Sequence, residues 1–143
     1  MRIELPELTR PNFEMIIPIR WGDMDAYGHV NNTVYFRYLE TVRIEWLRSA
    51  GAGMVQEGTG PIVVNAFCNF YQQLEYPGDI LARHYVANPG RSSFDAFVTL
   101  AKASQPDVVC AAGGSTTVWV DFQQQKSVPL PAHVAELLAR DTA

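Results

Sequence analysis

The chain has 143 residues, a length that fits one domain with a substantial buried core. Hydrophobic residues make up 48% and charged residues 18%, which is typical of a globular protein rather than of a disordered one. The formal net charge is -4 and the chain has no run of Lys or Arg that could neutralise phosphates. We therefore expect no nucleic-acid partner.

The two cysteines, Cys68 and Cys110, lie in apolar segments far apart in the sequence. This pattern is typical of small buried side chains rather than of a disulfide framework or a zinc site. A buried free thiol fits a reducing compartment, and the sequence has neither a charged-then-apolar leader nor an apolar run of membrane-spanning length. We expect a soluble, cytoplasmic protein with no membrane partner.

Hydrophobic periodicity predicts the first elements of the chain. Residues 1–12 are expected to form a loose N-terminal leader, and residues 13–143 a single domain. Phe13–Trp21 alternates apolar and polar residues, as a half-buried strand does. Pro18 has no N–H to donate to a neighbouring strand, so this strand is expected at a sheet edge or beside a bulge.

A polar turn follows this strand and leads directly into a helix predicted over Thr33–Ala50, which repeats apolar residues at three- and four-residue steps. Asn31 or Asn32 is suited to cap the helix. The first turn of a helix has N–H groups without intrahelical partners, and these favour negative charge. A carboxylate beside them provides the parts needed to attack a carbonyl and to hold the resulting oxyanion. The turn contains the following candidates: Asp23, Asp25, His29, Asn31 and Asn32.

The rest of the chain is rich in β-branched and aromatic residues, separated by turns that contain Pro, Gly, Asn or Asp. Gly113-Gly114 predicts a bulge or a close backbone approach. The predicted elements are strands at Pro61–Tyr76, Ile80–Val86, Ser93–Lys102 and Val108–Phe122, a loop at Lys126–Pro131, and a short amphipathic helix at Ala132–Arg140.

Four consecutive strands with short connections predict an antiparallel meander, with the long helix covering one of its faces. Apolar residues occupy both the odd and the even positions of Pro61–Tyr76, so both faces of this strand are apolar. A second subunit is therefore expected to cover part of the sheet. A homodimer is the minimum expectation.

The sequence resembles hotdog-fold acyl-CoA thioesterases, and more narrowly the 4-hydroxybenzoyl-CoA thioesterase family. The resemblance covers about Phe13 to Pro131 and is strongest in the D-x-D-x-x-G-H-V-N-N core of the polar turn. It implies an α+β hotdog fold, in which an antiparallel β-sheet wraps around a long central α-helix. The residues that carry it are Trp21-Gly22-Asp23-Met24-Asp25-Ala26-Tyr27-Gly28-His29-Val30-Asn31-Asn32, followed by Tyr35, Tyr38, Leu39, Glu40 and Arg43, with Gly90-Arg91-Ser92-Ser93 and Lys126–Pro131 further on.

The resemblance also implies the activity, which is hydrolysis of an acyl-CoA thioester to a free acid and CoA, without a metal or another cofactor. The catalytic carboxylate maps onto Asp25, as nucleophile or as general base, and the amide that polarises the thioester carbonyl maps onto Asn32. The enzyme is expected to be a homo-oligomer, as a dimer or a dimer of dimers (a homotetramer). CoA is expected at a subunit interface with its phosphates near the following residues: Arg91, Ser92, Ser93 and Lys126.

Each candidate also has a simpler structural interpretation. Asp25 could cap the following helix. His29 could donate to the thioester, or orient Asp25 or a water, or bond only to the backbone of the turn. Asp23 is expected to shape the turn or to bond Arg20, and Glu40 is expected to pair with Arg43 on the helix surface.

Arg91-Ser92-Ser93 could simply begin a strand, and Lys126 could be a solvated charge. His84 and His133 lack ligand spacing, so no metal site is expected. Two other functions remain open: a hotdog hydratase that acts on enoyl thioesters, and a non-enzymatic module that binds acyl thioesters. The acyl group, and the choice between CoA and an acyl carrier protein, also remain open.

Overall fold

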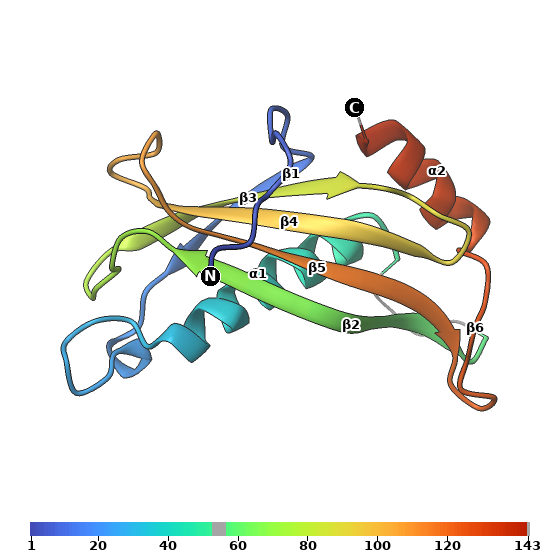
Figure 1. Cartoon of the computed structure of the whole chain (residues 1–143), viewed down its shortest axis with the longest axis horizontal. Coiled ribbons are helices and arrows are strands. Elements are labelled where there is room, and N and C mark those ends of the chain that lie inside the picture. The colour runs from blue at the N-terminus through green and yellow to red at the C-terminus, as the bar shows by residue number, and fades with distance from the viewer. Residues whose placement is uncertain (53–56, 143) are drawn as a thin grey trace.

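The computed structural model describes residues 1–52 and 57–142 and shows an antiparallel sheet of six strands with a helix along one face (Figure 1). This is the predicted α+β architecture. The elements in chain order are β1 (Phe13–Pro18), the short 3-10 helix η1 (Trp21–Asp23), α1 (Asn32–Ser49), β2 (Thr59–Phe70), β3 (Asp79–Ala87), β4 (Ser93–Lys102), β5 (Val109–Asp121), β6 (Lys126–Ser127) and α2 (Ala132–Asp141).

The strand order is β1-β3-β4-β5-β2, with the two-residue β6 paired to β5. The predicted meander of four consecutive strands is therefore wrong, because only β3, β4 and β5 follow one another. The cause is β1, which occupies the outer edge of β3 over six residue pairs and leaves β2 only the free edge of β5. Both β1 and β2 are edge strands, which agrees with the position expected for Pro18.

β2 ends at Phe70, six residues before the end of the predicted strand. After Phe70 the chain leaves the sheet, because the N–H groups of Tyr71 and Gln72 both donate to the carbonyl of Cys110. Leu74 is then fully buried against the start of α1, where its N–H donates to the Tyr35 hydroxyl at 3.1 Å. This segment forms one wall of the site described below.

α1 lies close against the sheet because β5 has no side chain where the two meet. A Cβ added at Gly113 would lie 2.6 Å from Cδ1 of Leu39, and one added at Gly114 would lie 2.7 Å from Cε1 of Phe67 on the opposite face. The close approach predicted for the glycine pair is thus confirmed. The 18 residues of α1 are about 27 Å long, whereas the 13 residues of β5 span about 43 Å. The helix is therefore short compared with this strand.

The N-terminal leader crosses the face of the sheet opposite α1 (Figure 1). Its backbone pairs with one side chain of β2, because the N–H of Ile3 donates to Oδ1 of Asn69 at 3.3 Å and Nδ2 of Asn69 donates to the carbonyl of Ile3 at 2.6 Å. The Arg2 guanidinium lies 5.2 Å from the centre of the Tyr71 ring. The leader is therefore attached to the domain rather than loose.

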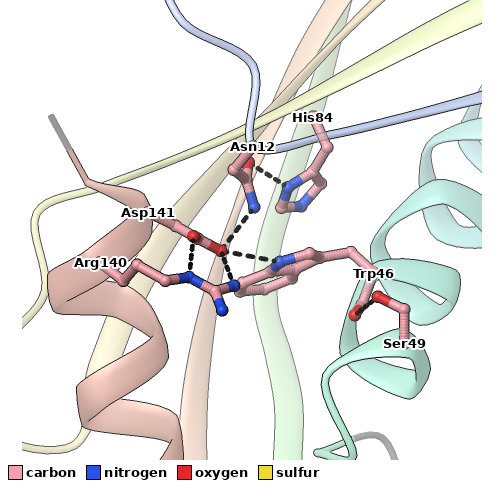
Figure 2. Close-up of polar contacts among 6 residues, drawn as sticks. All are labelled: Asn12, Trp46, Ser49, His84, Arg140 and Asp141. Carbon is pink, nitrogen blue, oxygen red and sulfur yellow. Dashed lines mark hydrogen bonds and ion pairs between the residues drawn. The ribbon is translucent and has the colours of Figure 1, made fainter.

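A polar cluster joins the leader, α1, β3 and the end of α2, as Figure 2 shows. The carboxylate of Asp141 accepts hydrogen bonds from Nδ2 of Asn12 and Nε1 of Trp46, each at 3.3 Å, and from Nε of Arg140 at 2.8 Å. Burial raises the pKa of Asp141, but these donors outweigh burial and hold it below its ordinary value.

His84 completes this cluster from β3. Its ring stacks on Trp46 with 4.6 Å between centroids, and its Nδ1 lies 3.0 Å from Oδ1 of Asn12. Nε2 is buried and has no hydrogen-bond partner among the described residues. Burial, assisted by the positive charge of Arg43, lowers the pKa of His84 to about 3, so the ring is neutral at physiological pH.

In the described part of the chain, no helix is long and apolar enough to cross a membrane.

Candidate active site

A cleft of about 400 Å³ lies between the start of α1 and the segment that follows β2. It brings together the three residues predicted to be catalytic, Asp25, His29 and Asn32. Its opposite wall contains Phe70 and the segment that bends away from the sheet, and Tyr35 lies at its floor. The polar residues of the motif thus face a wall that contains the aromatic residues Phe70 and Tyr71 and the amides Gln72 and Gln73.

The carboxylate of Asp25 is held by the turn that contains it. Its Oδ1 accepts from the N–H of Tyr27 at 2.9 Å, and its own N–H donates to the carbonyl of His29 at 2.9 Å. Gly28 allows this closure because its φ of 81° is unfavourable for residues with a side chain. Asp25 is therefore a turn residue, as its structural interpretation expected, but it also lines the cleft.

Asn31 connects this carboxylate to the helix. Its Oδ1 accepts from the N–H of Thr33 at 2.9 Å, which confirms Asn31 as the N-cap of α1. Its Nδ2 lies 3.4 Å from Oδ2 of Asp25. The sequence predicted the cap but not this second contact, because nothing local shows which way the amide of a capping residue points.

Asn32 is the first residue of α1, and its side chain is exposed. The next two N–H groups are satisfied by Asn31, since Thr33 donates to its side chain and Val34 to its carbonyl. Among the described residues, the N–H of Asn32 has no acceptor. A free donor at the positive end of a helix dipole, beside a carboxylate, is suited to hold a developing oxyanion.

The ring of His29 lines the cleft and makes no hydrogen bond to any described residue. Two of its predicted roles, bonding the backbone of the turn and directly orienting Asp25, are therefore not seen in the structure. The ring nitrogens remain available to a substrate or a water.

Asp23 lies beneath the turn, where it is buried, and does not line the cleft. Its Oδ2 accepts from the N–H of Arg20 at 2.9 Å and from the hydroxyl of Tyr38 at 2.7 Å. Burial and this carboxylate together raise the pKa of Tyr38. Asp23 has the structural role expected for it, anchoring the turn to α1.

Two further polar residues of the cleft, Gln72 and Gln73, were missed by the sequence analysis. They fell inside the strand predicted over Pro61–Tyr76, where their amides had no apparent role. The only local signal was a pair of adjacent polar residues that interrupts the apolar pattern.

The residues expected to bind CoA lie far from this cleft within one chain. Arg91 and Ser92 are in the turn between β3 and β4, where their carbonyls accept from the N–H groups of Leu130 and Trp119. Ser93 begins β4 and Lys126 begins β6. This end of the sheet is opposite the end where α1 begins (Figure 1).

The predicted ion pair between Glu40 and Arg43 is not formed. Glu40 accepts from Nη1 of Arg37 at 2.6 Å instead. Arg43 turns towards the sheet, where its Nη1 lies 3.5 Å from Oγ of Ser115. Both arginines are three residues from Glu40, so the spacing alone could not decide between them.

Comparison with known proteins shows the fold and the family of this chain. The PA2801 protein of Pseudomonas aeruginosa, a predicted thioesterase of known structure, is 31% identical, with a TM-score of 0.85 over 90% of this chain and 98% of that one. A 1,4-dihydroxy-2-naphthoyl-CoA thioesterase from Synechocystis shares the fold, with a TM-score of 0.80 at 15% identity over 89% of this chain and 95% of its own.

A predicted esterase of Aquifex aeolicus is 36% identical over 61 residues, which are 41% of this chain and 48% of that protein. The chain thus matches about half the length of that curated relative. Residues 19–138 match the model of the thioesterase-like superfamily. The hotdog fold and the thioester-hydrolase class that the motif predicted are in agreement with these findings, and the chain belongs to the thioesterase-like superfamily.

Proposed function

We propose that this protein hydrolyses acyl-CoA thioesters to a free acid and CoA, with Asp25 as the catalytic carboxylate. One observation carries the proposal: Asp25 and Asn32, whose backbone N–H has no acceptor among the described residues, line the same cleft. The first can attack or activate water, and the second can stabilise the oxyanion that forms.

In this mechanism the thioester carbonyl oxygen accepts from the N–H of Asn32, and negative charge develops on it in the field of the α1 dipole. As nucleophile, Asp25 forms a mixed anhydride and expels CoA thiolate, after which water cleaves the anhydride. As general base, Asp25 takes a proton from water while that water attacks the carbonyl carbon. Thiolate leaves readily, so neither route requires a strong general acid.

The neighbours of Asp25 support its role in two ways. The N–H of Tyr27 and the amide of Asn31 hold the carboxylate in position at the edge of the cleft that Asp25 lines. The ring of His29 has no protein partner, so it is available to donate to the substrate or to orient the attacking water.

A homodimer would bring the expected CoA-binding residues to the cleft. β2 is an edge strand with exposed Ile62, Val63 and Val64, which favours pairing with another strand. If two copies of β2 pair antiparallel about a two-fold axis, the far end of one sheet lies beside the cleft of the other. We therefore propose that CoA phosphates bind across this interface, and that pairs of dimers form the complete enzyme. The residues concerned are Arg91, Ser92, Ser93 and Lys126.

We place the enzyme in the cytoplasm, because Cys68 and Cys110 are free thiols. Burial raises the pKa of Cys68 to about 12, so this thiol is unreactive, and both cysteines are packing residues.

The test follows thiol release with a chromogenic reagent across aromatic, short-chain and long-chain acyl-CoAs. Asp25→Asn should lower kcat/KM by at least about a hundredfold on every ester that the wild type accepts. Asp107→Asn, which changes an exposed carboxylate in the turn before β5, is the control and should keep wild-type turnover. Full turnover by a folded Asp25→Asn enzyme would refute the mechanism, and turnover only on acyl carrier protein esters would correct the substrate.

A further inference from the structure

A second cavity, of about 230 Å³, lies further along α1, between that helix and strands β2, β4 and β5. Most of its wall is apolar and includes Phe36 and Leu39 of α1, Val63 and Ala66 of β2, and Val98 of β4. A pocket of this kind suits an aliphatic chain.

Arg43 adds a positive charge to this apolar cavity. Its guanidinium is half-buried, and its single hydrogen bond to a described residue is the 3.5 Å contact with Ser115. Burial lowers the pKa of Arg43, which shows that its surroundings disfavour the charge. Each side-chain nitrogen of Arg43 is either accessible to solvent or hydrogen-bonded. The N–H groups that have no partner are therefore accessible to a ligand.

No described carboxylate forms an ion pair with Arg43. Glu40 also lines the cavity, but its carboxylate is engaged by Arg37 at 2.6 Å. Glu40 therefore acts on Arg43 only through its charge, which opposes the lowering of the Arg43 pKa by burial, and leaves the N–H groups of Arg43 free to bind a ligand. A guanidinium has five N–H donors in a planar fork, the geometry that a carboxylate matches with two parallel hydrogen bonds.

The two cavities lie along the same helix and the same edge strand. Asn32 and Tyr35 of α1 line the catalytic cleft, and Phe36 and Leu39 line the second cavity. Arg43 follows Asn32 by eleven residues, which is about 16 Å at the rise of an α-helix. Only a long acyl chain, held by its thioester carbon at Asn32, can extend along α1 as far as Arg43.

We propose that the second cavity receives the far end of the acyl group, and that Arg43 binds a carboxylate there, which makes ω-carboxyacyl thioesters the preferred substrates. The methylene chain of such a group packs on the apolar wall, and its terminal carboxylate pairs with the guanidinium. The inference rests on the proposed function, since it assumes that the thioester is cleaved beside Asp25.

The test measures a ratio: kcat/KM on an ω-carboxyacyl-CoA divided by kcat/KM on the neutral ester of the same chain length. Suitable pairs are sebacyl- with decanoyl-CoA, dodecanedioyl- with dodecanoyl-CoA, and tetradecanedioyl- with tetradecanoyl-CoA, because shorter chains do not approach the distance of about 16 Å between Asn32 and Arg43. For the best pair, Arg43→Gln should lower this ratio about ten- to a hundredfold, as expected for loss of a charged hydrogen-bonded partner. Arg43→Lys keeps the charge but not the fork, and should lower the ratio less.

Arg48→Gln is the matched control, because Arg48 is an exposed arginine of the same helix that pairs with Glu45. It should leave the ratio at its wild-type value. A second measurement needs no variant: suberate should inhibit the wild type more strongly than its neutral diamide, suberamide, does. This inhibition measurement tests whether Arg43 binds a carboxylate even if Arg43→Gln fails to fold.

The outcomes separate this inference from the proposed function. If the wild type hydrolyses neutral esters and Arg43→Gln leaves the ratio unchanged, or if suberamide inhibits as well as suberate, the role of Arg43 is refuted and the hydrolase stands. If no CoA ester is cleaved, the proposed function fails. Calorimetry with suberate on the wild type and on Arg43→Gln then tests the site by itself, and equal binding refutes it.

Discussion

Acid should destabilise this protein through His84, well above the pH at which carboxylates titrate. The ring is 0% exposed and stacked on Trp46, and burial is the main cause that lowers its pKa to about 3, with Arg43 assisting and Asp141 opposing. In the unfolded chain the pKa is about 6.5. Between these values the unfolded state binds a proton that the folded state excludes, so stability falls as the pH falls.

The magnitude follows from these two pKa values. On going from pH 7 to pH 5, proton uptake by the unfolded state lowers the free energy of unfolding by about 2 kcal/mol. This loss of free energy depends on the pKa of His84 in the unfolded chain. It hardly changes with the pKa of His84 in the folded protein, provided that this pKa lies below about 4. Asp141 does not contribute in this window, because its folded pKa lies below the ordinary 3.8 and its stabilisation is lost only in stronger acid.

The assay is urea unfolding at these two pH values, at one protein concentration, for the wild type and His84→Gln. The glutamine variant has no imidazole at this position, so its pH-dependent loss should be smaller by about 2 kcal/mol, whatever its absolute stability. His133→Gln, which changes an exposed histidine of α2, should retain the wild-type loss. If the wild type and His84→Gln lose the same free energy between the two pH values, the ring is not held neutral by burial and the reasoning fails.

Three further substitutions test other contacts. Asn31→Ala should cost about 1 kcal/mol of stability, because the helix loses its cap. It should also lower kcat/KM in the thiol-release assay, because Asp25 loses its amide partner, and wild-type kinetics would refute that contact. Gly113→Ala should lower the free energy of unfolding by about 1–3 kcal/mol, measured by urea, since the new methyl would overlap both the backbone carbonyl of Phe67 and the side chain of Leu39. Asn69→Ala should release the leader, seen as faster proteolysis within residues 1–12; unchanged cleavage would show that Arg2 alone holds it.

The elements that the sequence predicted well are those set by neighbours in the chain. The helix over Asn32–Ser49 follows from its apolar repeat and its cap, and β4 has the predicted bounds. The place of β2 could not be predicted, because its pairing with β5 joins residues about fifty positions apart. Nothing in the β2 sequence distinguishes the edge of β5 from the edge of β3, which β1 already occupies.

The same distinction applies to the candidate site. Asp25, His29 and Asn32 lie in one turn, so the motif alone predicted that they share a cleft. Gln72 and Gln73 join them only because the chain bends away from the sheet after β2. The direction of Arg43 was equally inaccessible, since it depends on Ser115 of β5, a residue far away in sequence.

The missing side chain at Gly113 affects the chemistry as well as the packing. Leu39 rests on this position, and the free N–H of Asn32 belongs to the same helix, seven residues earlier, about 10 Å away. A helix moves as a stiff rod, so a shift or tilt at Leu39 is transmitted to its first turn. In the proposed mechanism, the distance between the N–H of Asn32 and the carboxylate of Asp25 therefore depends on the absence of a methyl group in the middle of the sheet.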